Sequence, residues 1–164
     1  METILRITNL HKKFEVNIAG ISLGVTNNKI GFSDLTGNED FEKRAKVLID
    51  KAAAHIEACY DPERKVYTNA VGSTHLDAST LQLIMMNYLD PASDRAKDHL
   101  TALEKELKTE DGLFYRYLHA DDFGKPKTTF LICAFWYVEA LACVGRTDEA
   151  IKEFENIIKY CNHL

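Results

Sequence analysis

Residues 128–144 read TTFLICAFWYVEALACV, an almost wholly apolar run whose one charged residue is Glu139. A helix that is apolar on every side is stable only when other helices surround it. The run therefore predicts a buried helix, and the segments that surround it have to come from the flanking sequence. Glu139 lies in the middle of this helix, where we expect a structural carboxylate and not a catalytic one.

Helical patterns flank this run on both sides. An amphipathic pattern begins after TGNE, which is typical of a helix start, and ends near Tyr60. Its apolar positions are Phe41, Ala45, Leu48, Ala52 and Ile56. A second apolar run, DASTLQLIMMNYL, predicts a helix over residues 77–89, which Asp77 can cap. A further helix follows, with Ala96, Leu100, Leu103 and Leu107 on its apolar side. Thr147 can cap a last amphipathic helix, which carries Ile151, Phe154, Ile157, Ile158 and Cys161.

The chain repeats one order of elements twice. Each unit has an amphipathic helix, an Asp next to Pro or Gly, a Tyr-bearing extended piece, a polar linker and an apolar helix. The linkers, residues 61–77 and 111–128, have nearly the same length. A period of about 50 residues is typical of stacked helical hairpins. We predict an all-α fold, an incomplete α/α toroid, because six such hairpins need on the order of 300 residues.

Residues 1–38 differ from the remainder of the chain. Residues 12–32, KKFEVNIAGISLGVTNNKIGF, are β-branched and partly alternating, a pattern that favours a short β-hairpin near the N-terminus. We therefore expect two parts, residues 1–38 with uncertain structure and residues 39–164 with the helical domain.

Composition excludes several classes of function. The formal charge is −5 and no run alternates basic with aromatic residues, so we expect no nucleic acid as partner. No apolar run reaches the roughly 20 residues of a membrane span, and the start lacks a signal peptide, so we expect no membrane and a cytoplasmic protein. Scattered Cys and His residues predict buried thiols, no metal and no cofactor. The cysteines are Cys59, Cys133, Cys143 and Cys161.

Three motifs carry a resemblance to a known family. They are YTNAVGSTHLDASTL at 67–81, DGLFYRY at 111–117 and DDFGKPKTTFLICAFWYVEALACVGR at 121–146. In this order and spacing, about residues 42–164 resemble glycoside hydrolase family 15, the glucoamylase and trehalase-like enzymes. The resemblance implies part of an (α/α)6 toroid, a six-hairpin glycosidase fold. Its parent enzymes are hydrolases of carbohydrate metabolism that cleave α-glucosidic bonds with inversion.

Inverting hydrolysis needs a protonated carboxylic acid and a second carboxylate that activates water. The resemblance implies that this base is a glutamate three residues ahead of the phenylalanine that matches Phe130. That position is Lys127 here. An ammonium group has no lone pair to accept a proton from water, so we expect the catalytic base to be substituted. The family's Trp-Glu acid motif should lie far upstream, and residues 1–41 contain no such motif.

The second linker supplies candidates for substrate binding: Tyr115, Arg116, Tyr117, Asp121 and Asp122. Sugars stack on aromatic rings, and a guanidinium group fixes their hydroxyls. The resemblance favours Arg116 as a sugar contact. Equally, the tyrosines could pack at the toroid rim while Arg116 pairs with Asp121 or Asp122. The two adjacent acids are more typical of a solvated turn than of a catalytic pair.

These observations favour a family 15-like protein that is truncated and inactive alone, with an α-glucoside or oligosaccharide as its ligand. The alternative functions are a non-catalytic carbohydrate-binding module, a helical protein-interaction module, or a gene remnant that merely folds. Open toroid ends predict self-association or a partner, and FLICAFWYV and LQLIMM are the runs that we expect to be exposed.

Overall fold

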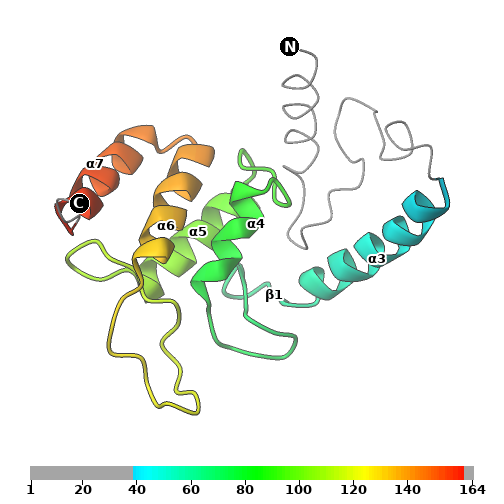
Figure 1. The fold of residues 1–164 in the computed structure, drawn as a ribbon, viewed down its shortest axis with the longest axis horizontal. Helices are drawn as coiled ribbons and strands as arrows, with labels where there is room; N and C mark the ends of the chain where they lie inside the picture. The colour runs from blue at the N-terminus through cyan, green and yellow to red at the C-terminus, as the bar shows by residue number, and fades with distance from the viewer. Residues whose placement is uncertain (1–38, 161–164) are drawn as a thin grey trace.

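The computed structural model describes residues 39–160, which form a mostly helical fold (Figure 1). Five α-helices, two short 3-10 helices and a two-stranded antiparallel sheet make up the described chain. In chain order they are α3 (Glu39–Glu57), β1 (Tyr60–Asp61), β2 (Val66–Tyr67), η1 (Ala78–Leu81), α4 (Gln82–Met85), α5 (Asp94–Leu107), α6 (Leu131–Cys143), α7 (Thr147–Ile157) and η2 (Ile158–Tyr160). The expectation of a predominantly helical fold is confirmed. The expected hairpin over residues 12–32 lies outside the described residues.

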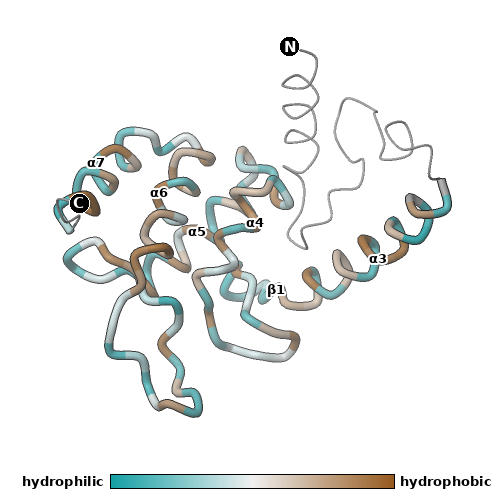
Figure 2. The backbone as a smooth tube through the Cα atoms, in the orientation of Figure 1, coloured by the Kyte–Doolittle hydropathy of each residue, from teal (hydrophilic) through white to brown (hydrophobic). Residues whose placement is uncertain are grey.

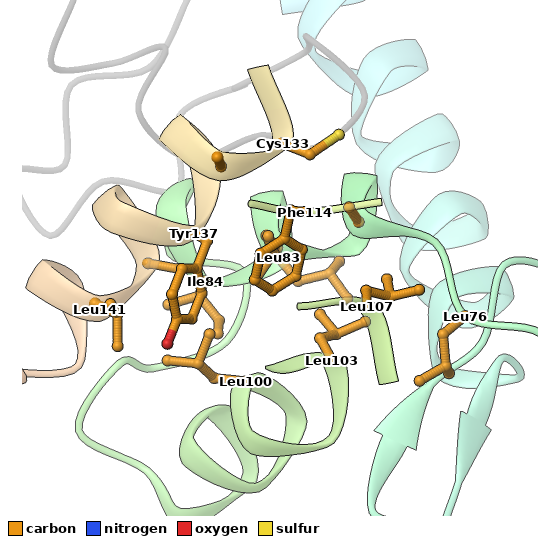
Figure 3. Packing of buried hydrophobic residues seen from close by; sticks show 14 of the residues in the cluster. Leu76, Leu83, Ile84, Leu100, Leu103, Leu107, Phe114, Cys133, Tyr137 and Leu141 are labelled. Atoms are coloured by element: carbon orange, nitrogen blue, oxygen red, sulfur yellow. The ribbon is translucent and has the colours of Figure 1, made fainter. Parts of the chain in front are cut away.

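Helix α5 forms one wall of the core. Ser93 caps its start by accepting a hydrogen bond from the amide of Ala96. Its apolar side is fully buried, as its four-three-four spacing predicts. The buried residues of α5 are Ala96, His99, Leu100, Leu103 and Leu107. Figure 3 shows several of them packed against Phe114, Ile84 and Tyr137 from other segments.

Helix α6 is buried on one side only, although its sequence predicts burial all round. Cys133, Ala134, Tyr137, Ala140 and Leu141 face the core. The opposite side, which begins with Leu131 and Ile132, is exposed. The prediction of complete burial was wrong because α7 and the core cover only part of the helix surface. The start also differs, since α6 begins at Leu131 and not at Thr128.

The predicted helix over residues 77–89 is much shorter in the structure. Its first turn is the 3-10 helix η1, and the α-helical part ends at Met85. Asn87 adopts the left-handed conformation, with φ of 56°, which turns the chain out of the helix. The expected Asp77 cap is present, because the Asp77 carboxylate accepts a hydrogen bond from the Ser79 amide at 2.7 Å. Leu83 and Ile84 are buried, so the expected exposure of LQLIMM was wrong at these residues.

Helix α3 extends away from the other helices (Figure 1). Its C-terminal end meets the remainder of the structure through Glu57, which accepts hydrogen bonds from Tyr67, Tyr88 and Arg95. Of the predicted apolar side, Ala45 is buried and Ile56 partly buried, whereas Leu48 is exposed. The amphipathic pattern therefore produced a helix, but burial of that side is incomplete.

Helix α7 packs against α6 and begins at Thr147, so the predicted last amphipathic helix is present. The expected Thr147 cap was wrong, because Arg146 occupies the N-cap position and no side chain caps the helix. Arg146 instead contacts Glu104 of α5 at 3.0 Å and also pairs with Glu149. Ala150 and Ile157 are buried.

Both predicted extended pieces form backbone pairings. Tyr60 pairs with Tyr67 in the register of β1 and β2. In the second unit, Phe114 bridges Lys108, and its carbonyl accepts from the Phe130 amide at 2.9 Å. The second linker thus leaves and re-enters the core at Phe114 and Phe130.

The cysteines are not uniformly buried. Cys133 is buried as expected and Cys59 is partly buried, but Cys143 is exposed, so that prediction was wrong there. Cys143 is the last residue of α6. Over residues 39–160, no cluster of His, Cys, Asp and Glu has metal-binding geometry, and no helix is long and apolar enough to cross a membrane.

Candidate functional site

The two polar linkers hang from the same side of the helices (Figure 1) and are joined at their bases. Arg116 of the second linker contacts Asp77 of the first, with 2.6 Å between Nε and Oδ1. The Ala78 amide also donates to the Arg116 carbonyl at 2.8 Å. Because Asp77 is the cap of η1, one carboxylate both starts that helix and holds the second linker.

The contact with Asp77 changes the pKa of Arg116. The hydrogen bond from Arg116 to the Asp77 carboxylate raises the pKa of the guanidinium above its ordinary value. The expected alternative, a pair between Arg116 and Asp121 or Asp122, was wrong for this structure. Arg116 is half-buried and reaches back toward η1, whereas both acids lie in an exposed turn further along the linker.

A stack of three aromatic rings connects the linkers next to this pair. The rings of His75 and His119 lie 4.5 Å apart at 17°, and those of Tyr117 and His119 lie 4.5 Å apart at 30°. His119 therefore sits between His75 of the first linker and Tyr117 of the second. Its Nδ1 atom is buried and has no hydrogen-bond partner among the described residues. Neither histidine was expected at the site.

Tyr117 and Asp121 close the second linker on itself. The Tyr117 hydroxyl donates to the Asp121 carboxylate, which also accepts from the Phe123 amide at 2.8 Å. The Tyr117 hydrogen bond lowers the pKa of Asp121 and raises the pKa of Tyr117. Asp121 and Gly124 form a backbone bridge, so the adjacent acids occupy the expected solvated turn. Asp122 is exposed in this turn.

Tyr115 is attached to the core through its backbone. Its amide donates to the Leu107 carbonyl at 2.9 Å, which attaches this residue to the end of α5. Its side chain is half-buried. Of the five predicted binding residues, the structure connects Arg116 and Tyr117 to the junction of the two linkers, and Asp121 joins them through Tyr117.

Lys127 is exposed on the second linker, three residues ahead of Phe130, where the chain re-enters the core. Among residues 39–160, it has no hydrogen bond or ion pair within the usual distances. The linkers therefore present a cation at this position and, at the junction, the pair of Asp77 with Arg116. A pocket of about 360 Å³ lies elsewhere, between α5 and the end of α6. None of the predicted site residues lines it.

The sequence did not predict the two stacked histidines, although His75 lies within the 67–81 motif that carries the family resemblance. His75 lies two residues ahead of the capping Asp77, and His119 lies two residues beyond Tyr117. Ring stacking between two loops depends on how the fold brings the loops together. The spacing of residues within one loop gives no information about that. The signal that was available is the similarity of the two linkers in length and position in the repeat.

Comparisons with known proteins identify a family for this chain. Residues 28–162 match the family described as Glycosyl hydrolases family 15. The chain is 32% identical to a trehalase of Mycobacterium tuberculosis over 131 residues, which are 78% of this chain and 19% of that protein. It is 31% identical to a trehalase of Thermoplasma acidophilum over 105 residues, 64% of this chain and 18% of that protein. The chain thus spans about one fifth of the length of these relatives.

Solved structures support the fold. A wild-type glycosidase structure aligns with a TM-score of 0.58 at 18% identity, covering 82% of this chain and 33% of that one. At this level of identity the likeness concerns the fold alone. It agrees with the expected portion of a larger helical architecture.

Proposed function

This chain belongs to glycosyl hydrolases family 15, and from that membership we propose that it binds α-glucosides through its two linkers but does not hydrolyse them by itself. The chain would thus bind the same class of ligand as the family, without catalysing the hydrolysis. It rests on the residues of the linkers, and above all on Lys127.

Lys127 is the observation that carries this proposal. It occupies the position that the family resemblance gives to the water-activating glutamate. An ammonium group has no lone pair with which to take a proton from water, and burial is the usual way in which proteins hold a lysine in its neutral form. Lys127 is exposed. An inverting glycosidase without a base carboxylate loses one of the two groups that the reaction requires.

The junction of the linkers supports sugar binding. His75 and Tyr117 stand at the two ends of the ring stack, and their outer faces supply aromatic surface on which the C–H faces of a pyranose ring can stack. Arg116 has a planar guanidinium whose Nε is used by Asp77, and its remaining N–H groups can donate to sugar hydroxyls. We propose trehalose as the first ligand to test, because the curated relatives are trehalases.

Hydrolysis is tested with the purified chain and trehalose, maltose and a nitrophenyl α-glucoside. We expect no glucose or nitrophenol above the buffer blank, for the wild type and for Lys127→Ala. Turnover by the wild type that disappears in Lys127→Ala would contradict the proposal, because Lys127 would then take part in catalysis.

Binding is tested separately by calorimetry with the same sugars. We expect heat of binding for the wild type and roughly tenfold weaker binding for Arg116→Ala, which loses charged hydrogen bonds. Lys46→Ala is the control, because Lys46 is an exposed residue of α3 that pairs with Asp50 of the same helix. Absence of heat with every sugar would contradict the binding function while leaving the hydrolysis result intact.

A further inference from the structure

An apolar surface runs over α6 and α7 on the side away from the core. This α6–α7 face consists of Leu131, Ile132, Phe135, Ile151, Phe154 and Ile158. Phe135 and Phe154 join the two helices, with ring centroids 6.4 Å apart. Leu131 is 44% exposed and Ile151 is 53% exposed. Figure 2 shows apolar residues along both helices. A contiguous apolar surface of this kind marks an interaction site.

A second apolar surface lies on α3. Val47 and Leu48 form this α3 face, and Leu48 is 56% exposed. Helices α3 and α7 stand at opposite ends of the long axis of the molecule (Figure 1). One copy therefore cannot bring its α3 face onto its own α6–α7 face.

The charges around the two faces are opposite. On a helix, the neighbours of a residue are those three and four positions away. For Leu48 these neighbours include Arg44 and Lys51 and no acid. For Val47 they also include Lys43 and one acid, Asp50, so cations outnumber acids around the α3 face. For Ile151 they include Asp148 and Glu155 and no base. Arg44 also pairs with Asp40 at 3.1 Å, but both side chains are strongly exposed, and such pairs contribute little.

We propose that the α3 face of one copy docks on the α6–α7 face of a second copy, in a head-to-tail assembly. The apolar residues supply burial, and the cations around Leu48 meet the anions around Ile151. Because the two faces differ and lie at opposite ends, each added copy leaves one free face of each kind. The proposal concerns association of the chain and is independent of sugar binding.

Charge also argues against pairing of like faces. Two α6–α7 faces would bring Asp148 and Glu155 against the same residues of the other copy, and two α3 faces would bring Arg44 and Lys51 together. Like charges that meet across an interface oppose association. Only the pairing of an α3 face with an α6–α7 face both buries apolar side chains and brings opposite charges together.

The test uses one variant for each face. Leu48→Glu places an acid on the α3 face, and Ile151→Lys places a base on the α6–α7 face. Both positions are exposed in helices, and Glu and Lys are good helix formers, so we expect folding to be retained. Circular dichroism checks the helix content. Ile158→Lys, on the same face as Ile151, serves as the second variant if Ile151→Lys reduces the helix content.

Sedimentation velocity of the wild type should show a mass above the monomer that rises with protein concentration. Each variant alone should be monomeric at the same concentrations, with association weakened roughly tenfold or more. An equimolar mixture of the two variants should form a dimer and nothing larger, because one intact face remains on each copy. Val71→Glu is the matched control, an apolar-to-acid change at an exposed residue of the first linker, and should associate like the wild type.

Three results would overturn the proposal. The first is a monomeric wild type at every concentration, which would mean that these faces are covered within the chain. The second is a Leu48→Glu variant that associates like the wild type, because the α6–α7 faces would then pair with each other. The third is a mixture of the two variants that stays monomeric.

Discussion

The two helical units of this chain have the same order of elements but differ in how much of each is buried. In the second unit, α5 buries its whole apolar side and α6 buries one side. In the first unit, α4 is a short helix, and Leu48 of α3 is exposed. The difference teaches that periodicity decides whether a segment becomes a helix, whereas the neighbours available decide whether its apolar side is covered.

The linkers behave differently from the helices. The units differ in how much of their helices is buried, but their linkers contact each other directly. Asp77 forms an ion pair with Arg116, and the ring of His75 stacks on the ring of His119. The candidate site is therefore built between the units, from two linkers of nearly the same length and the same place in the repeat.

The largest difference should appear when equivalent leucines are truncated. Leu103→Ala in α5 removes a fully buried side chain and should lower the free energy of unfolding by about 2–5 kcal/mol. Leu48→Ala in α3 should change it by less than about 0.5 kcal/mol, because that side chain is exposed. Urea unfolding followed by circular dichroism measures both. Equal losses would mean that α3 belongs to the same core as α5.

The joint between the units should make the protein sensitive to acid. His99 of α5 is buried, its Nδ1 accepts from the Tyr67 amide at 3.2 Å, and its Nε2 lies 3.1 Å from the Thr80 carbonyl. Burial lowers the pKa of His99 from 6.5 to about 4. The unfolded chain therefore binds the proton more readily, and stability is lost as the pH falls from 6.5 to about 4. The His99 contribution is about 3 kcal/mol over this window.

Urea unfolding at about pH 7 and about pH 4 measures this loss in the wild type and in His99→Gln. The variant keeps a polar side chain but cannot be protonated, so its stability should fall less between the two pH values. An equal fall in both proteins would show that other groups cause the acid sensitivity.

A smaller effect should follow a change at the turn into the second linker. Gly112 has a φ of 81°, and a Cβ atom there would lie 2.5 Å from Nδ2 of Asn156 and 2.8 Å from Oε2 of Glu153. Gly112→Ala should cost about 1–2 kcal/mol through backbone strain and displacement of these α7 side chains. Gly72→Ala in the first linker, with a φ of 72° but no atom within 4 Å, is the control for backbone strain alone. Thermal unfolding of both separates the crowding from the strain.

The smallest effects should come from the ion pairs. Arg116→Met should cost about 1 kcal/mol, because the pair with Asp77 is partly buried and short. Lys46→Met should cost about 0.3 kcal/mol, because its pair with Asp50 lies on the exposed surface of α3. Urea unfolding at low and high salt distinguishes them. A loss at Lys46 that equals the loss at Arg116 would contradict the assignment of the linker junction as the tighter contact.

Most of the helices could be predicted from sequence because their signals are local. The apolar spacing of α5 and the cap at Asp77 each depend on residues within one turn. The short α4 could not be predicted from the apolar run alone, because the left-handed Asn87 ends it early. The partial exposure of α6 depends on which helices pack against it, and the sequence of α6 alone does not reveal those neighbouring helices.

The candidate site could be predicted only in part. The family resemblance identified Arg116, Tyr117 and the substituted Lys127 from their motifs. The roles of these three residues in binding and catalysis stay predictions. The partner of Arg116 could not be predicted, because Asp77 lies 39 positions away in the chain and competes with nearer acids. Contacts between segments that distant depend on the packing of the whole fold.

The attachment of α3 at Glu57 has a mechanical consequence. This helix has 19 residues and is therefore about 28 Å long at 1.5 Å per residue. Three side chains hold its last turn through one carboxylate, so Glu57 acts as a pivot and the helix as a lever arm. A tilt of about 10° at the pivot would move the far end by roughly 5 Å. A small tilt at Glu57 would therefore displace the opposite end of α3 further than it displaces the residues around Tyr67 and Arg95.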